Sequence, residues 1–205
     1  WPSSGGAMGI ETACARPIHI IESGPAAGVV GAAELAKKLG YADVLTFDMG
    51  GTTAKASMIE GGRFERVGEL DVGGGISMSG RLLTGGGYHV RVPAIDIAEV
   101  GAGGGSLVRI DAGGALRVGP ESAGADPGPV CYDQGGVAPT VTDANVVLGF
   151  VNPEYLVGGG LTLNRDKAAA AIEERIARPL GVSLEDAAYG VHIVANAMMA
   201  RALRA

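Results

Sequence analysis

The chain has 205 residues, of which 47% are hydrophobic and 19% charged, which excludes an intrinsically disordered protein and is typical of a globular one. Its net charge of -6 argues against a nucleic-acid partner, because such a partner needs a basic surface. The sequence has no apolar run of about 18 residues and no secretory leader, so we expect a cytoplasmic protein without a membrane span.

Two further features concern the cysteines and the ends of the chain. Cys14 and Cys131 lie far apart and outside any CxxC motif, so we expect reduced, buried thiols instead of a disulfide or a zinc site. The chain starts at Trp1 and stops within an expected helix, which suggests a piece of a larger protein.

The first half of the chain is expected to be mostly β-structure. A Gly-Gly pair, Gly61 and Gly62, predicts a hairpin, and Gly40 is a typical end for the helix before it. We expect a strand at 16–23, a helix at 24–40, and strands at 44–49, 53–60, 63–72, 88–100, 106–111 and 115–119.

The second half turns helical after an ordered loop or lid at 120–140. Helices are expected at 142–150, 164–181 and 183–205, with Asn164 and Ser183 as N-caps. One apolar stripe is expected on the last helix, formed by Ala187, Val191, Val194, Met198 and Ala202.

The stretch FDMGGTT carries the clearest chemical signal. Asp48 ends an apolar strand, and Gly50 and Gly51 let a charged ligand approach the backbone. Thr52 and Thr53 add hydroxyl and amide donors, so the turn can hold phosphate oxygens while the carboxylate holds Mg²⁺ or its water shell. An ordinary tight β-turn is the competing interpretation, and the motif is not a P-loop.

Six blocks of the sequence resemble the hydantoinase/oxoprolinase family, also called the hydantoinase A family. They are SSGG, SGPAAGVVGA, FDMGGTT, GAGGGS, GPESAGADPGPVCY and PTVTDANVVLG, in this order along the chain. The resemblance implies ATP-dependent hydrolysis of hydantoin, N-methylhydantoin or 5-oxoproline, with related ketone carboxylase subunits as the alternative. A non-catalytic assembly module is the third possibility.

The resemblance also implies an α/β fold: an actin-like ATPase (RNase H-like) domain with a glycine-rich β insertion and C-terminal helices. Residues 1–40 would connect to a missing first domain, and 41–205 would form the second, with the insertion at about 72–140. The Asp48 hairpin would be the second phosphate loop of an ATP site. Asp48 would support Mg²⁺, and another divalent metal is left open.

Lys55 is a departure from the family, many of whose members carry an acid at this position. Its ammonium group can meet a phosphate or a substrate carboxylate. Alternatively, Lys55 is a solvent-facing strand residue.

Ring opening of a cyclic amide needs a base and positive charge near a developing oxyanion. Asp126, Asp143 and His89 are the candidates for base or metal ligand, although Asp143 can be only a helix N-terminal acid.

Other residues are expected to be structural or are left open. His19, in the strand at 16–23, and His192 are expected to be structural, as is Cys131. For the GAGGGS loop, a dinucleotide-binding motif is disfavoured. Glu99 and Ser106 beside it can face a substrate cavity, or the loop can be a tight crossing of two strands.

The partners implied by the resemblance are a small cyclic amide and an oligomer, either of identical chains or with a hydantoinase B-type subunit. We expect the 205 residues alone to be inactive, because half of the phosphate clamp is missing.

Overall fold

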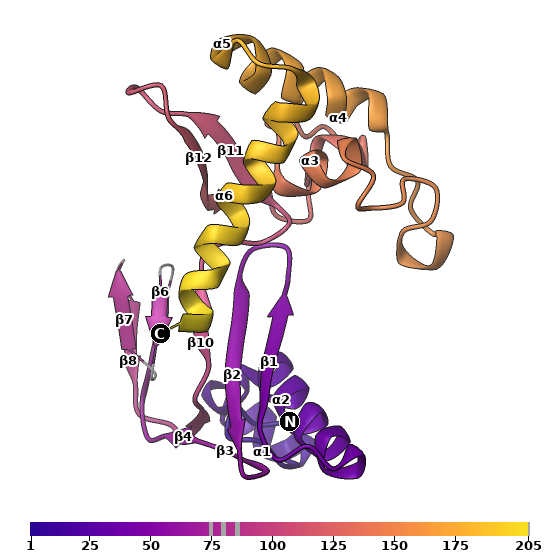
Figure 1. The fold of residues 1–205 in the computed structure, drawn as a ribbon. Coiled ribbons are helices and arrows are strands. Elements are labelled where there is room, and N and C mark those ends of the chain that lie inside the picture. Colours follow the sequence, from indigo (N-terminus) through magenta and orange to yellow (C-terminus); the bar gives the residue numbers. More distant parts are fainter. Residues whose placement is uncertain (74–75, 79–80, 85–86, 205) are drawn as a thin grey trace. The chain divides into compact units, whose positions relative to one another are not determined.

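The computed structural model describes residues 1–205 apart from 74–75, 79–80, 85–86 and 205 (Figure 1). The chain forms two compact units. Unit 1 comprises 1–48, 54–100 and 201–205, and unit 2 comprises 49–53 and 101–200. The boundaries expected from the resemblance, at 1–40, 41–205 and about 72–140, stay predictions.

Unit 1 combines short helices with most of the strands (Figure 1). Its helices are α1 (Ile10–Ala15), a 3₁₀ turn (Pro17–Ile20) and α2 (Ser23–Leu39). Its strands are β1 (Val44–Met49), β2 (Ala54–Glu60), β3 (Arg63–Phe64), β4 (Arg66–Val67), β5 (Leu70–Gly73), β6 (Ile76–Met78), β7 (Arg81–Thr84), β8 (Gly87–Val90), β9 (Ala94–Ile95) and β10 (Ala98–Val100).

The strand predicted at 16–23, which would have contained His19, is wrong. Pro17 begins the 3₁₀ turn, where its fixed φ fits and its missing N–H is not needed. Ser23 then opens α2, which ends as predicted at Gly40 with φ 80. The amide of Tyr41 donates to the carbonyl of Ala36, which closes the helix end.

The main sheet has the strand order β1-β2-β10-β6-β7, and β3 also pairs with β2. The predicted Gly-Gly hairpin is confirmed, because Ile59 pairs with Phe64 across Gly61 and Gly62, both at positive φ. In the antiparallel pair of β2 and β10, Lys55 lies opposite Glu99. Cross-strand partners lie on the same face of a sheet, so these two side chains are neighbours.

The core of unit 1 lies between α2 and the sheet. Ala26 and Val29 of the helix pack with Ile59 and Ile95, and all four are at most 5% exposed. The helix is thereby held over the strands that carry Asp48 and Lys55.

Unit 2 contains one hairpin and most of the helices (Figure 1). Its elements are β11 (Ser106–Ile110), β12 (Leu116–Ser122), a 3₁₀ turn (Val130–Tyr132), α3 (Val141–Val147), a second 3₁₀ turn (Val157–Gly159), α4 (Arg165–Ile172), a π-helical turn (Glu173–Ala177), α5 (Arg178–Leu180) and α6 (Leu184–Arg204).

The two predicted N-caps are confirmed. Asn164 Oδ1 accepts from the amide of Lys167 and Ser183 Oγ from that of Asp186, each at 3.1 Å.

The buried face of α6 differs in part from the predicted stripe. Ala187 and Val191 are buried as expected, but the buried face continues through Ala195 and Met199 instead of Val194 and Met198. The side chain of Ala202, the last residue of the predicted stripe, lies outside the described part of the chain. The buried positions are four residues apart, and each such step advances about 40° past a full turn, so the buried face winds around α6 instead of running straight along it.

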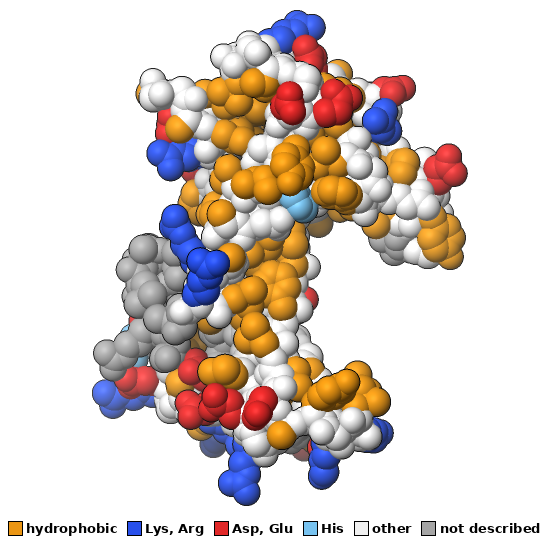
Figure 2. Space-filling model, viewed as in Figure 1, with side chains coloured by type: hydrophobic (Ala, Val, Ile, Leu, Met, Phe, Trp, Pro, Cys, Tyr) orange, Lys and Arg blue, Asp and Glu red, His pale blue; other side chains and the backbone are white. Residues whose placement is uncertain are grey.

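The outer face of α6 carries exposed apolar side chains. Figure 2 shows hydrophobic side chains gathered over this helix, and Tyr189 and Ile193 are about half exposed.

None of the helices in the described part of the chain has both the length and the apolar content that a membrane span requires.

Candidate functional site

The turn between β1 and β2, residues 50–53, is the candidate phosphate-binding element. It is closed by the amide of Gly50, which donates to the carbonyl of Thr53 at 2.9 Å. The hydroxyl groups of Thr52 and Ser122 lie 3.4 Å apart. Within the described residues, the amides of Gly51 and Thr52 donate no hydrogen bond, so these donors are available to a ligand.

The two glycines of the turn are not required by the fold. A Cβ on Gly51 would meet no atom within 4 Å, and one on Gly50 would meet only the Thr53 carbonyl at 3.5 Å. Neither residue has a positive φ. Neither crowding nor backbone strain therefore explains glycine here, and both positions leave room for an external group to approach the backbone.

The loop formed by Gly103, Gly104 and Gly105 lies directly against this turn. The amide of Gly104 donates to the Gly50 carbonyl at 3.0 Å, and that of Gly105 to the Gly51 carbonyl at 2.6 Å. The loop therefore crosses the 50–53 turn at close range, which supports the alternative of a tight crossing for GAGGGS, although the segment crossed is a turn and not a strand. The other is wrong for Ser106, which is fully buried and accepts from the Gly103 amide.

Unit 1 has a cavity of about 460 Å³ between α2 and β1. Most of its wall is apolar, and its charged residues are Asp48 and Lys55. The complete lining is Pro25, Gly28, Val29, Ala32, Val44, Leu45, Thr46, Phe47, Asp48, Lys55, Ala56 and Ile97. A largely apolar cavity with few polar groups is typical of a ligand site.

Lys55 is held between two carboxylates. Its Nζ lies 2.8 Å from Glu22 Oε2 and 3.1 Å from Glu99 Oε1, and its side chain is only 15% exposed. Burial disfavours the charged ammonium, but the hydrogen bond to Glu22 and the two negative charges outweigh burial and raise the pKa of Lys55. The solvent-facing alternative is wrong, and Glu99 faces this ammonium.

Glu22 is a residue that sequence reasoning missed. It lies 33 positions before Lys55, just ahead of α2, and no local pattern connects the two. Its place directly before the SGPAAG block was the only available signal.

Asp48 is exposed, and its side chain forms no hydrogen bond or ion pair within the described residues. Those residues contain no cluster of three or more His, Cys, Asp or Glu side chains that could hold a metal ion by themselves. Mg²⁺ that arrives on a nucleotide needs only one or two carboxylates, since phosphates and water complete its shell. Asp48 therefore fits as a ligand of nucleotide-borne Mg²⁺, not as part of a protein-only metal site.

Asp143 has a structural position. It is fully buried, and its Oδ2 accepts from the amide and the hydroxyl of Thr140, each at 2.8 Å, in a capping box at the start of α3. The amides of Val130 and Cys131 donate to the same carboxylate at 3.2 and 2.7 Å. These bonds support the alternative of a helix N-terminal acid and extend it to the 120–140 loop.

The two free cysteines lie in different surroundings. Burial, followed by the charge of Asp143, raises the pKa of the Cys131 thiol, which favours the structural role expected for it. Cys14 is exposed, so the expectation of a buried thiol is wrong for that residue.

His89 lies in unit 1 on β8, opposite Asp71 of β5. Its Nδ1 is 2.9 Å from Asp71 Oδ1, and its Nε2 is 3.2 Å from Glu69 Oε2. The hydrogen bond to Asp71 raises the pKa of His89, and the charge of Glu69 adds to this effect. Both ring nitrogens are engaged, so the geometry favours a cation that joins two strands over a free base.

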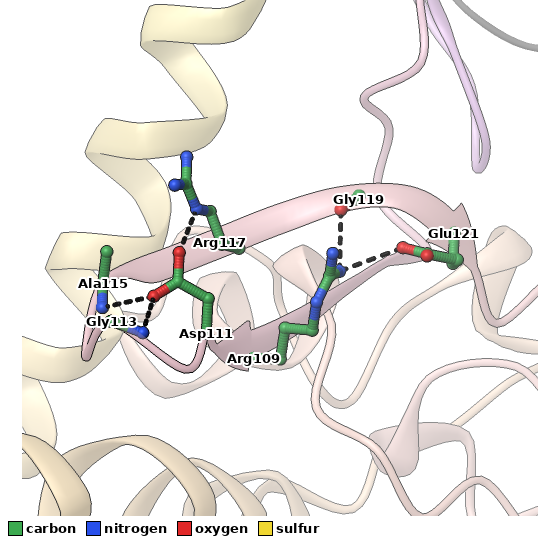
Figure 3. A network of polar contacts seen from close by, with 7 residues as sticks. All are labelled: Arg109, Asp111, Gly113, Ala115, Arg117, Gly119 and Glu121. Carbon is green, nitrogen blue, oxygen red and sulfur yellow. Dashed lines mark hydrogen bonds and ion pairs between the residues drawn. The ribbon is translucent and has the colours of Figure 1, made fainter. Parts of the chain in front are cut away.

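The loop after β12 carries Asp126, which is exposed and whose side chain forms no hydrogen bond within the described residues. Glu121, at the end of β12, is instead paired with Arg109, whose Nη1 lies 2.9 Å from the carboxylate and also donates to the Gly119 carbonyl (Figure 3). Of the acids in this block, Asp126 is therefore the one left available.

The β-turn of the same hairpin is held by Asp111. Its Oδ1 accepts from the amides of Gly113 and Ala115, and its Oδ2 lies 2.7 Å from Arg117 Nε (Figure 3). The bond from Ala115 and the Arg117 guanidinium keep the pKa of Asp111 below its ordinary value. This network stabilises the hairpin, and both oxygens of the Asp111 carboxylate are engaged in it.

Comparisons with known proteins agree with one another. A family model described as Hydantoinase/oxoprolinase matches residues 2–205. The chain is 52% identical over 202 residues to an uncharacterized protein of Methanocaldococcus jannaschii, and this match covers 98% of the chain and 29% of that protein. It is 42% identical over 189 residues to caprolactamase subunit alpha of Pseudomonas jessenii, covering 92% of the chain and 25% of that protein.

Solved structures give the same result. The crystal structure of the ATP-dependent caprolactamase matches with a TM-score of 0.72 over 91% of the chain and 25% of the solved chain, at 42% identity. Nucleotide-free acetone carboxylase, from work on ATP-dependent acetone carboxylation, matches with a TM-score of 0.74 at 35% identity over 87% of the chain and 24% of the solved one. The expected α/β fold is confirmed, and the chain spans 24% to 29% of the length of these relatives.

Proposed function

Since the chain belongs to the hydantoinase/oxoprolinase family, we propose that the full-length protein is an ATP-dependent enzyme that opens a cyclic amide of the hydantoin, N-methylhydantoin or 5-oxoproline type. This chain contributes one phosphate-binding turn, residues 50–53, together with Asp48. The names of its relatives support ATP dependence, because both solved structures are described as ATP-dependent.

The observation that carries the proposal is the open space at Gly51. The residue has no neighbour within 4 Å of a built Cβ and no positive φ, yet the position carries glycine. Its amide and that of Thr52 are unpaired within the described residues. Unpaired amides on a bare backbone are the usual means by which a protein binds phosphate oxygens.

Four of the cofactor-binding candidates have a proposed task each. Asp48 holds Mg²⁺, directly or through water, and Gly51 and Thr52 donate to phosphate oxygens. Lys55, which is held by the carboxylates of Glu22 and Glu99, offsets part of the negative charge of the ATP phosphates. ATP, when bound, supplies the phosphoryl group that makes the amide carbonyl electrophilic enough for attack by water.

Asp126 is the proposed general base, because it is the candidate acid that is exposed and unpaired within the described residues. Asp143 and His89 are occupied by the contacts described above and serve this proposal only as structural groups.

A carboxylase is the second candidate, favoured by the TM-score of 0.74 to acetone carboxylase. The same phosphate-binding turn serves a reaction in which ATP activates bicarbonate or a ketone enolate. Hydrolysis and carboxylation therefore differ in the substrate, not in this turn.

The names of the relatives also bear on assembly, since caprolactamase subunit alpha is one part of a larger enzyme. We therefore propose that the full-length protein forms an oligomer, with a hydantoinase B-type subunit as the preferred partner. The 205 residues alone are expected to be inactive because they contain one turn of the phosphate site.

The proposal is tested on the full-length protein with its partner subunit. ATP titrated with and without Mg²⁺ should bind more tightly with the metal, and hydantoin or 5-oxoproline should then be opened with release of phosphate. Incorporation of labelled bicarbonate into a ketone would identify the carboxylase instead. Absence of ATP binding would leave the non-catalytic assembly module as the better account.

A further inference from the structure

We propose that the run Gly103–Gly105 is a positioning template, which fixes the 50–53 turn in the conformation that binds its ligand. The inference rests on the proposed function of that turn, which it deepens. The template residues do not touch the ligand themselves, and they act through the backbone of Gly50 and Gly51.

The first argument is steric. A Cβ on Gly103 would lie 2.7 Å from the carbonyl oxygens of Gly50 and Gly51, and one on Gly105 would lie 3.0 Å from the Gly51 oxygen. Real Cβ atoms do not approach backbone atoms at 2.7 Å, so any side chain at Gly103 must displace the turn or the loop. Glycine is required at Gly103 because of the turn, whereas Gly51 itself has open space.

The second argument is the pattern of hydrogen bonds. The amides of Gly104 and Gly105 donate to two successive carbonyls of the turn, at 3.0 and 2.6 Å. With both carbonyls fixed, the peptide planes of the turn are fixed as well, and so are the directions of the amides that these planes carry. A hairpin turn already closed by its own bond between Gly50 and Thr53 does not need this support to form.

The third argument is that the template is itself anchored. The Gly104 carbonyl accepts from both the amide and the hydroxyl of Thr142, at 2.8 and 2.9 Å, in the first turn of α3. The Gly105 carbonyl accepts from the amide of Ala123, just after β12, at 2.8 Å. Two separate elements of unit 2 thus hold the loop, so amides that bind a ligand are oriented before it arrives.

The decisive experiment compares Gly103→Ala with wild type in the full-length protein, with Gly190→Ala as the control. Gly190 lies on α6, where an added Cβ would meet only a Leu116 methyl group at 3.4 Å. We expect Gly103→Ala to weaken the binding of Mg²⁺-ATP about tenfold or more and to speed hydrogen exchange at the Gly104 and Gly105 amides. Gly190→Ala should change neither.

A milder pair of variants decides the matter if Gly103→Ala does not fold. Thr142→Val removes the hydroxyl bond to the Gly104 carbonyl and keeps the shape, while Thr142→Ser keeps the hydroxyl. We expect Thr142→Val to weaken ATP binding about threefold at an unchanged unfolding temperature, and Thr142→Ser to bind like wild type. A purely structural role would move the unfolding temperature instead.

The outcomes separate this inference from the proposed function. If folded Gly103→Ala or Thr142→Val binds Mg²⁺-ATP with wild-type affinity, the proposed role of Gly103–Gly105 is wrong. If the wild type binds no ATP, the proposed function fails, and hydrogen exchange alone judges the template. Faster exchange at Gly104 and Gly105 in Gly103→Ala would then support it, and unchanged exchange would refute it.

Discussion

Gly51 shows how an absent side chain can point to a ligand. We predict that Gly51→Ala leaves stability unchanged or raises it by up to about 1 kcal/mol, because the position has space and no positive φ. The same methyl group would meet a bound phosphate, so ATP affinity in the full-length protein should fall about tenfold or more. Thermal unfolding and calorimetric titration measure the two effects, and unchanged affinity would contradict the assignment of the turn.

Lys55 makes the second prediction at the scale of single residues. Lys55→Met leaves Glu22 and Glu99 facing each other without the ammonium between them, so we expect a loss of about 2 kcal/mol of stability. Lys55→Arg, which keeps the charge, should lose much less. The control is Arg117→Met, because Arg117 is 60% exposed in its pair with Asp111, so this substitution should cost less stability than Lys55→Met. Equal losses of stability in the two variants would show that Lys55 contributes no more to stability than an exposed ion pair does.

What the sequence reveals about single residues depends on whether their partners are close along the chain. The 50–53 turn after Asp48 and the caps Asn164 and Ser183 follow from short patterns, and the caps are confirmed. The carboxylate of Glu22 beside Lys55 comes from 33 positions away, and only the folded sheet and helix bring the two together. No spacing rule covers such a pair.

Helix α3 depends on a buried carboxylate, which gives a prediction at the scale of elements. Asp143→Ala would leave the amides of Thr140, Val130 and Cys131 without their acceptor, so we expect about 2–4 kcal/mol of destabilisation and faster hydrogen exchange at these amides. Asp186→Ala, at the exposed start of α6, should cost about 1 kcal/mol or less. A small effect at Asp143 would show that the carboxylate is not structural and would return it to the candidates for catalysis.

The pairing of β5 and β8 should depend on pH through His89. The pKa of His89 is raised above 6.5 in the folded chain, so its stabilising effect is complete below that pH and is lost as the pH rises through the folded pKa. The charged groups facing it are Asp71 and Glu69, and Arg91 lies 3.9 Å from Glu69. Titration by NMR should give a pKa above 6.5, and Asp71→Asn should lower it. A value at or below 6.5 in the wild type would contradict the pairing.

Most elements were predictable, but the strands expected at 63–72 and 88–100 are each divided into three short ones, and the strand expected at 16–23 is wrong for a physical reason. Gly40, Gly61 and Gly62 mark boundaries by their positive φ, which few other residues adopt. The segment at 16–23 has the apolar content of a strand, but Pro17 at its start favours a helical turn. The tight crossing of the GAGGGS loop over the 50–53 turn is a long-range contact, which only the structure could decide.

At the scale of the whole molecule, the chain covers about a quarter of its relatives, 25% of the caprolactamase alpha subunit among them. The turn of unit 2 and the cavity of unit 1 therefore each belong to a segment of proteins that are about four times as long. The cavity of about 460 Å³ beside Asp48 and the exposed apolar face of α6 are surfaces that other parts of a full-length protein can cover. We therefore propose activity and assembly only for the full-length protein.

The most direct test of the account is the affinity of the full-length protein for Mg²⁺-ATP after Asp48→Ala, with Asp166→Ala on the exposed first turn of α4 as the control. We predict that Asp48→Ala weakens binding at least about tenfold and abolishes the advantage that Mg²⁺ gives, while Asp166→Ala leaves both unchanged. Undiminished affinity together with undiminished turnover in Asp48→Ala would contradict the account.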